Sequence, residues 1–250
     1  MSLPQNPITP DLFDAVLFDL DGVLTSTAKV HSSCWKTMFD DFLARRASQR
    51  NEPFRPFDIA ADYKLYVDGK LRYEGVRGFL ASRNISIAEG TPADPPTADT
   101  VCGLGNRKDA LVKAALDQGE VESYPGSVAL VLRLREQGIR TAVVSSSNNC
   151  EQVLRAVGLI DLFEARVDGL IASELHLPGK PKPDTFLKAA EMLQVIPARA
   201  VVVEDAIAGV QAGRAGGFGL VIGVDRGGSS DALRTHGADV VVTDLGELLS

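Results

Sequence analysis

The sequence has few cysteines, and their positions exclude two classes of small protein. The three cysteines, Cys34, Cys102 and Cys150, are far apart and odd in number. They therefore predict neither a disulfide framework nor a thiolate metal cluster. We expect free thiols in a reducing cytoplasm.

The sequence also lacks a surplus of positive charge and any long apolar run. Its formal net charge is −7, which gives no support for a nucleic-acid partner or an anionic membrane surface. No apolar run approaches the roughly 20 residues of a membrane span. The first residues lack the charged start and apolar stretch of a signal peptide, and we expect a cytoplasmic protein. A phosphorylated substrate remains compatible, because a few local cations can bind phosphate inside an acidic protein.

What the sequence does contain is an alternation of apolar strands and amphipathic helices. Short branched, apolar runs predict strands, and runs of 3.6-residue period between them predict helices. Strand and helix alternating at this spacing predict an α/β fold with a doubly wound, mostly parallel sheet, apolar on both faces. The expected strands are 13–18, 139–144, 200–203, 220–224 and 239–242, and the expected helices are 128–137, 150–157 and 185–193.

Residues 28–122 break this rhythm. Helical patterns cover 28–44, 74–82 and 107–116, with proline-rich stretches between them and no convincing strand. We predict a helical cap domain of residues 28–122, inserted into a discontinuous core domain of residues 1–27 and 123–250.

Polar residues follow three of the predicted strands at the point where each strand ends. Ligands of open α/β sheets bind beyond the carboxyl ends of the strands. Taken singly, an aspartate there is often only a helix cap, and a Ser-Asn run only a turn. Together, up to four carboxylates would crowd into one volume, which favours a cation between them. With no histidine or cysteine nearby, the oxygen ligands indicate Mg²⁺. The residues concerned are Asp19, Asp21, Ser145, Asn149, Glu204 and Asp205.

Four segments resemble the motifs of the haloacid dehalogenase (HAD) superfamily in order and spacing. Phe18–Val23 resembles its first motif, D-x-D-G, and Ser145 falls where the second motif lies. Gly179–Asp184 resembles the third, and 203–209 the fourth. The resemblance covers essentially the whole chain and implies a Rossmann-like core.

The resemblance implies a role for each of these residues. Asp19 would attack phosphorus and form an aspartyl phosphate. Asp21 would act as general acid and base, and Ser145 would hydrogen-bond the phosphoryl group. Lys180 would neutralise charge on Asp19 and the phosphoryl group. From the residues alone, Lys182 is an equal candidate, and the resemblance selects Lys180. Mg²⁺ would be held by Asp19, Asp21, Glu204 and Asp205.

The cap region resembles the β-phosphoglucomutase family within that superfamily. The segment 25–31 followed by Trp35 matches the family pattern except at Ser26, where aspartate is usual. The segments 66–80 and 103–108 resemble one branch of the family. Trp35 could instead be cap core, and Arg72, Lys70 and Arg107 a solvated basic face. The resemblance implies these substrate-binding residues: Thr27, His31, Trp35, Gly69, Arg72, Lys108, Ser147 and Asn149.

A mutase that works through glucose 1,6-bisphosphate needs two phosphate sites, one in the core domain and one in the cap domain. We therefore expect a Mg²⁺-dependent β-phosphoglucomutase that interconverts β-D-glucose 1-phosphate and D-glucose 6-phosphate. The alternative is a sugar-phosphate phosphatase with the same nucleophile, and a third reading is a non-catalytic binding module on this fold. The expected partner is a small phosphorylated sugar, and we expect a monomer or a weak dimer.

Overall fold

The computed structural model of the protein describes residues 7–119 and 121–249, and the chain divides into two compact units. The core unit comprises Met1–Ser26 and Val121–Ser250, and the cap unit comprises Thr27–Glu120. The sequence-based boundaries fell after residues 27 and 122, one or two residues further along. Residues 1–6 of the expected core domain lie outside the described residues.

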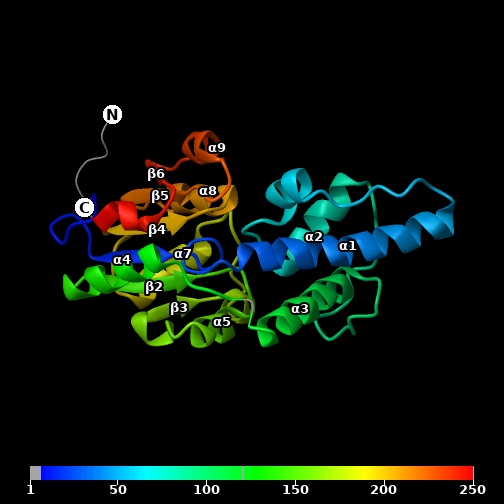
Figure 1. The fold of residues 1–250 in the computed structure, drawn as a ribbon, viewed down its shortest axis with the longest axis horizontal. Coiled ribbons are helices and arrows are strands. Elements are labelled where there is room, and N and C mark those ends of the chain that lie inside the picture. Colours follow the sequence, from blue (N-terminus) through cyan, green and yellow to red (C-terminus); the bar gives the residue numbers. More distant parts are fainter. Residues whose placement is uncertain (1–6, 120, 250) are drawn as a thin grey trace. The chain divides into compact units, whose positions relative to one another are not determined.

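The core unit is built on one parallel sheet with the strand order β3-β2-β1-β4-β5-β6 (Figure 1). Every described strand pair is parallel, so the predicted α/β doubly wound fold is confirmed. The strands are β1 (Ala15–Phe18), β2 (Arg140–Val144), β3 (Ala165–Val167), β4 (Ala200–Glu204), β5 (Leu220–Val224) and β6 (Val240–Val242). The helices are α4 (Pro125–Glu136), α5 (Cys150–Ala156), α6 (Gly169–Glu174), α7 (Asp184–Met192), α8 (Ile207–Ala215) and α9 (Ser230–Thr235), with short 3₁₀ turns η2 (Ile160–Leu162), η3 (Pro197–Arg199) and η4 (Leu245–Leu249).

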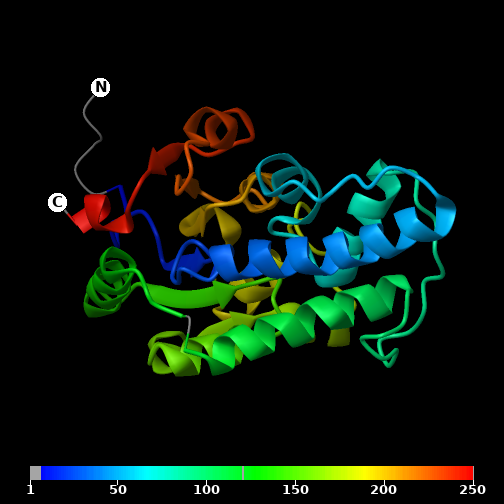
Figure 2. The same ribbon diagram turned by 45° about the vertical axis from the view of Figure 1, so that its right-hand side comes forward.

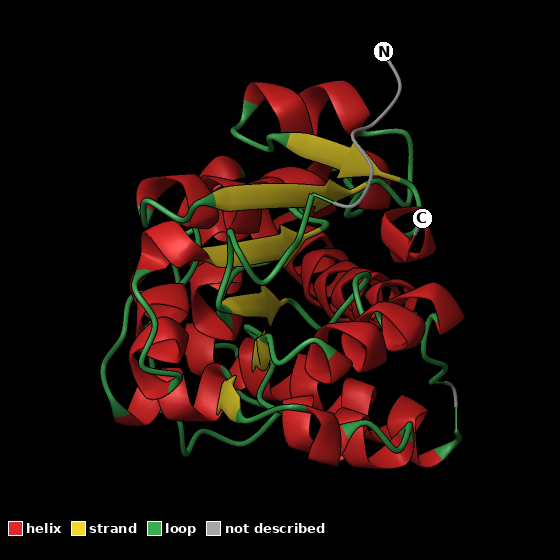
Figure 3. Ribbon diagram, turned by 90° about the vertical axis from the view of Figure 1, so that its left-hand side faces the viewer, coloured by secondary structure: helices red, strands yellow, loops and turns green. Residues whose placement is uncertain are grey.

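Helices lie on both faces of this sheet (Figure 3). On one face, Leu17 and Val202 pack with Phe186 of α7 and Ala212 of α8 in a single buried cluster. The alternate strand residues point to the opposite face, where α4 packs against β2. Burial on both faces explains why the strands are apolar throughout rather than alternating.

The edge strand β3, which pairs with β2, is absent from the strands that the sequence predicts. This strand has three residues, and its middle residue, Arg166, is charged and half-buried. Arg166 forms an ion pair with Asp168, at 2.8 Å, and with Glu151, at 2.7 Å. A strand this short with a central arginine carries no apolar run, so hydrophobic periodicity could not reveal it.

The order of the strands determines where the polar residues at their carboxyl ends meet. Strand β1 lies between β2 and β4, so the chain moves to one side of β1 and later to the other. Such a switch in direction opens a crevice at the carboxyl ends of the strands. In the register, Phe18 lies opposite Val143 and Val203. Asp19 and Glu204 therefore lie at the same level on the two strands that border the crevice.

The cap unit is helical, and none of its described residues lies in a strand. Helices α1 and α3 run side by side (Figure 2) and contact each other. The elements are α1 (Ala28–Arg50), the π-helical segment η1 (Ile59–Val67), α2 (Arg72–Ser82) and α3 (Val101–Asp117).

An aromatic cluster forms the centre of the cap unit. Phe39 of α1 is fully buried and stacks on Trp35, with ring centroids 5.3 Å apart. It also contacts Phe57 at 5.1 Å and Phe79 of α2 at 4.2 Å. The Phe39 side chain thus links α1, the segment around Phe57 and α2.

Helix α3 begins six residues before the position predicted from the sequence. Its N-cap is Thr100, whose hydroxyl accepts a hydrogen bond from the Gly103 amide at 2.9 Å. Gly103 and Gly105 look like helix breakers in the sequence, but a Cβ at these positions would collide with Ala98 and Tyr73. Glycine at these two positions therefore lets Ala98 and Tyr73 pack closely against α3. Helix α1 likewise extends past 44 to Arg50, and η1 was not predicted.

Among the described residues, no helix combines the length and the apolar character needed to cross a membrane.

We expect Phe39→Ala to lower the free energy of unfolding of the cap unit by about 3–5 kcal/mol, because it leaves a cavity among three rings. Trp35, the only tryptophan in the chain, reports on this unit by fluorescence during urea denaturation. The control Leu65→Ala removes a side chain that is 60% exposed and should cost less than about 0.5 kcal/mol. Equal costs for the two variants would contradict the assignment of the aromatic cluster as the core of the unit.

Candidate active site

Three carboxylates meet at the carboxyl edge of the sheet. Asp19 follows β1, Glu204 ends β4 and Asp205 comes next in the chain. One oxygen from each lies within 4.8 Å of the others. The backbone amide of Asp19 donates to the Val203 carbonyl at 2.9 Å, which continues the β1–β4 pairing up to the site.

Lys180 provides the positive charge of this cluster. Its ammonium group donates to Asp19 at 2.5 Å, to Glu204 at 2.6 Å and to the Val144 carbonyl at 3.0 Å. Lys180 is 1% exposed, whereas Lys182 points to solvent. The structure thus separates two lysines that the residue pattern alone could not.

Burial and charge shift the titration of these groups in physically clear directions. Burial raises the pKa of Glu204 to about 7, and Asp19 adds to the rise, while Lys180 opposes it. Burial would lower the pKa of Lys180, but the charges of Asp19 and Glu204 outweigh it and raise that pKa. One ammonium therefore leaves the negative charge of the carboxylates incompletely balanced.

The residues present fit a hard divalent cation. The converging donors are carboxylate oxygens, and the raised pKa of Glu204 indicates charge that a further cation would stabilise. Oxygen donors of this kind suit Mg²⁺. The carboxylate of Asp21 is not part of the three-residue group.

Glycine at two positions leaves the space that the carboxylates of Asp205 and Glu204 occupy. Gly22 has a φ of +85°, and a Cβ there would overlap the Asp205 carboxylate. A Cβ on Gly209, in α8, would overlap the carboxylate of Glu204. Glu204 cannot easily move aside, because it is fully buried and also accepts from the Ala206 amide at 2.9 Å. Both glycines are required by close approach to an acidic side chain.

The loop after β2 brings Ser145, Ser147 and Asn149 to the same edge. Ser145 is 2% exposed, and its hydroxyl accepts from the Ser147 amide at 3.0 Å. The Ser147 hydroxyl accepts from the Asn149 amide at 3.2 Å. These turns hold the segment between β2 and α5. Lys180 is linked to the same strand end through the Val144 carbonyl.

Arg226, in the loop after β5, holds the turn that follows the first motif. Its Nε donates to the Gly22 carbonyl at 3.0 Å and its Nη1 to the Thr243 carbonyl at 2.8 Å. Its guanidinium lies 3.7 Å from the centroid of the Tyr124 ring and forms an ion pair with Asp244 at 3.1 Å. The sequence does not predict this role of Arg226, because no local pattern links the residue to a turn 204 positions earlier in the chain.

Within the cap unit, the structure brings together three of the predicted substrate residues. The buried Lys108 lies 2.8 Å from Nδ1 of His31 and 5.2 Å from the centroid of the Trp35 ring. An ammonium group has only donors, so the His31 nitrogen accepts. Burial first, and then the Lys108 charge, hold the pKa of His31 well below its ordinary value of 6.5. Trp35 belongs to the aromatic core cluster as well.

The other predicted cap residues are Thr27, Gly69 and Arg72, and the Thr27 carbonyl accepts a hydrogen bond from the His31 amide at 2.9 Å. Arg72 forms an ion pair with Asp109 at 2.9 Å, and its guanidinium lies 5.0 Å from the centroid of the Tyr73 ring. Gly69 has a φ of +69° in the turn before α2, and Thr27 is fully buried before α1. Arg107, the alternative basic candidate, pairs with surface aspartates.

Comparison with known proteins finds similarity over nearly the whole chain. A family model described as haloacid dehalogenase-like hydrolase matches residues 13–217. The β-phosphoglucomutase of Mycobacterium bovis is 52% identical, covering 96% of this chain and 93% of that protein. The β-phosphoglucomutase of Bacillus subtilis is 32% identical, covering 94% and 91%. A crystal structure of β-phosphoglucomutase from Clostridium difficile, 23% identical, shares the fold with a TM-score of 0.73 over 94% of this chain and 93% of that one.

We expect Gly209→Ala to weaken Mg²⁺ binding by about 10–100-fold, because the added methyl displaces the Glu204 carboxylate. Titration calorimetry with Mg²⁺ measures the effect. In the control Gly227→Ala, the added methyl has no described residue other than its chain neighbours within 4 Å, and this variant should bind Mg²⁺ like the wild type. Unchanged affinity in Gly209→Ala would mean that Glu204 does not hold the ion.

We expect His31 to stay neutral in the folded protein well below pH 6.5. The unfolded chain takes up this proton near pH 6.5 and the folded chain does not, so this group makes stability fall as pH drops below that value. The chain has only three histidines, so ring signals in NMR can be assigned with a His31→Gln variant. A His31 signal that titrates near pH 6.5 would contradict the buried, neutral assignment.

Proposed function

The chain belongs to the HAD superfamily and, within it, to the β-phosphoglucomutase family, and on that basis we propose that it interconverts β-D-glucose 1-phosphate and D-glucose 6-phosphate. The observation that carries this proposal is 52% identity to a β-phosphoglucomutase along 96% of the chain. The buried cluster of carboxylates and one lysine at the sheet switch point is the matching feature of the structure.

Asp19 is the proposed nucleophile. Its carboxylate lies at the end of β1, beside the ammonium of Lys180, which would stabilise the negative charge of an arriving phosphoryl group. Attack by an Asp19 oxygen forms a bond to phosphorus and breaks the bond from phosphorus to the sugar oxygen. The product on the enzyme is an aspartyl phosphate.

Asp21 is the proposed general acid and base. It lies two residues beyond the nucleophile, in a tight turn in which the Gly22 amide donates to the Thr25 carbonyl at 2.8 Å. As acid it gives a proton to the departing sugar oxygen, and as base it takes the proton of the attacking hydroxyl. Arg226 holds this turn through the Gly22 carbonyl, which supports a fixed position for Asp21.

Asp19, Glu204 and Asp205, with the backbone carbonyl of Asp21, are the proposed holders of Mg²⁺. When bound, the ion supplies charge stabilisation for the transferring phosphoryl group. Ser145, at the end of β2, is proposed to hydrogen-bond the phosphoryl oxygens, with Ser147 and Asn149 close along the same loop.

The full reaction balances as two transfers. Phosphorylated Asp19 gives its phosphoryl group to the 6-hydroxyl of β-glucose 1-phosphate, which forms glucose 1,6-bisphosphate. The bisphosphate then returns the 1-phosphoryl group to Asp19 and leaves glucose 6-phosphate. The enzyme ends each cycle phosphorylated, as it began.

The substrate phosphate that is not being transferred needs its own cationic contacts. In the cap unit, Lys108 and Arg72 are the proposed contacts, and His31, Trp35, Gly69 and Thr27 the proposed surroundings of the sugar. The burial of Lys108, whose ammonium group lies 2.8 Å from Nδ1 of His31, supports this role. Arg72 is already paired with Asp109, so its contact with phosphate would be shared.

The second candidate function is a sugar-phosphate phosphatase, in which water replaces the sugar hydroxyl as acceptor. The matching family model is described as a hydrolase, and the same nucleophile would serve. The two functions differ in their product.

We expect purified protein with Mg²⁺ to convert β-glucose 1-phosphate to glucose 6-phosphate, with stimulation by glucose 1,6-bisphosphate. Phosphorus NMR distinguishes the substrate, both sugar phosphates and inorganic phosphate in one spectrum. Release of inorganic phosphate without glucose 6-phosphate would exclude the mutase and support the phosphatase.

We expect Asp19→Asn to lower turnover by at least about 10³-fold, because an amide oxygen is a poor nucleophile. The same substitution at the exposed Asp161 serves as the control and should leave turnover unchanged. Substantial activity in Asp19→Asn would rule out the aspartyl-phosphate route for either product.

A further inference from the structure

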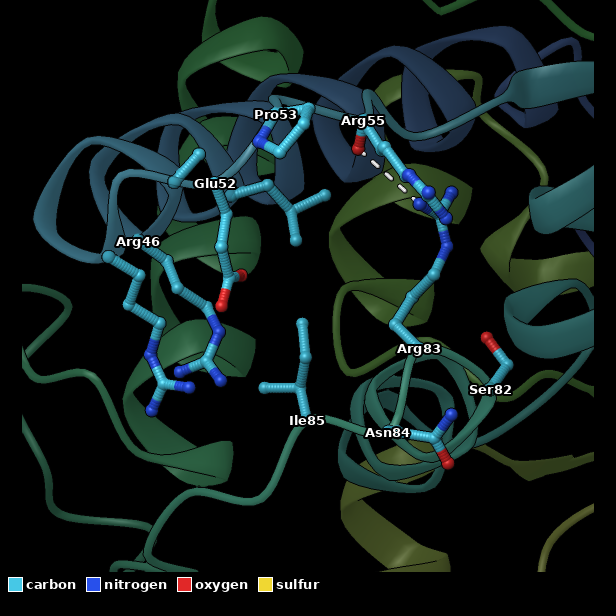
Figure 4. A pocket seen from close by; sticks show the side chains of 11 residues that line it. Arg46, Glu52, Pro53, Arg55, Ser82, Arg83, Asn84 and Ile85 are labelled. Carbon is cyan, nitrogen blue, oxygen red and sulfur yellow. Dashed lines mark hydrogen bonds between the residues drawn. The ribbon is translucent and has the colours of Figure 1, made fainter.

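The cap unit contains a pocket of about 530 Å³ at the carboxyl end of α1 (Figure 4). It is lined by the last turns of α1, the segment that follows, and the turn after α2. In Figure 4, Arg46 and Glu52 lie on one side, Arg55 and Arg83 on the other, and Ile85 between them. None of these residues belongs to the candidate active site.

The arginines of the cap unit fall into two groups. Of its eight arginines, five form ion pairs with carboxylates in the same unit. The remaining three have no ion pair or side-chain hydrogen bond to any described residue, and all three line this pocket: Arg46, Arg50 and Arg55. Arg83 also lines the pocket, but Asp62 balances its charge at 2.6 Å.

This grouping leaves positive charge in one place on an acidic chain. The net charge of the protein is −7, and among the described residues Glu52 is the one acidic residue that lines the pocket. Arg46 and Arg50 are one helical turn apart, and like charges at that spacing repel. The dipole of α1 favours Arg50 in the last turn, but it gives no reason for Arg55, which lies beyond the helix. An anion in the pocket would offset the repulsion.

The lining also has an apolar part. Leu43 and Ala47 of α1 and the half-buried Ile85 contribute carbon surface beside the guanidinium groups. A volume near 530 Å³ lies within the range of small-molecule sites. Guanidinium groups bind phosphate with two parallel hydrogen bonds, which makes arginine well suited to phosphate recognition.

We propose that this pocket binds a small organic phosphate that carries at least two negative charges and an apolar or aromatic body. The phosphates contact Arg46, Arg50 and Arg55, and the body lies against Ile85 and the neighbouring carbon surface. The proposal stands independently of the reaction at Asp19.

ADP is the probe, since it joins a diphosphate to an aromatic base. Titration calorimetry is carried out in EDTA, so that divalent ions neither neutralise the phosphates nor fill the core site. We expect one binding event that weakens as NaCl is added. Replacement of all three unpaired arginines by glutamine should weaken ADP binding by about tenfold per arginine, so that the triple variant gives no measurable binding heat. The triple variant is Arg46→Gln, Arg50→Gln and Arg55→Gln.

A control variant removes the same charge elsewhere by replacing Arg45, Arg77 and Arg155, which point to other partners. We expect this control to bind ADP like the wild type. Both variants should retain the turnover of the wild type, because these arginines lie outside the candidate active site. Both should melt close to the wild-type temperature, because exposed or half-buried arginines and their ion pairs contribute little to stability. Equal losses in the two variants would show only an effect of net charge and would overturn the proposal.

Two further probes separate the two parts of the ligand. Pyrophosphate, which lacks the body, should bind more weakly than ADP, and adenosine, which lacks the charge, should not bind measurably. Three results would overturn the proposal: no ADP binding by the wild type, ADP binding that survives the triple variant, or adenosine binding as tightly as ADP.

Discussion

The buried contact between Lys180 and the carboxylates of Asp19 and Glu204 is the interaction on which the rest of the candidate site depends. Three acidic groups within 4.8 Å of one another would repel strongly in a dry environment. A single ammonium, 1% exposed, lowers that repulsion without removing it. Burial, to which the charge of Asp19 adds, raises the pKa of Glu204 to about 7. Three carboxylates and one ammonium leave negative charge at this edge of the sheet, which suits a divalent cation.

The backbone is arranged around this cluster of charges. The parallel register brings the ends of β1 and β4 to one level, and the β2 end joins through the Val144 carbonyl. Close approach then requires glycine at Gly22 and Gly209, where any side chain would overlap a carboxylate. Arg226, in the loop after β5, holds the turn after Asp21 through the Gly22 carbonyl. The geometry of the candidate site thus depends on both charge and available space.

Much of the fold and of the core site could be predicted, because both depend on local patterns. Apolar runs that end in Asp19 or in Glu204 are visible in the sequence, and their convergence follows from the rules for parallel sheets. Selection of Lys180 over Lys182 needed the family resemblance, since two lysines two residues apart look alike until burial separates them. The role of Arg226 was out of reach, because its partners are brought near only by the tertiary fold. Helix α3 was predicted too short, because Gly103 signals a break in sequence and a close contact in structure.

The most direct test of the phosphoryl relay is to locate the phosphoryl group on the enzyme. Protein incubated with Mg²⁺ and glucose 1,6-bisphosphate is quenched in acid, digested and examined by mass spectrometry. The expected result is a phosphoryl group, labile to hydroxylamine, on the peptide that contains Asp19. A phosphoryl group on another residue, or its absence from an enzyme that is turning over substrate, would contradict Asp19 as the covalent nucleophile.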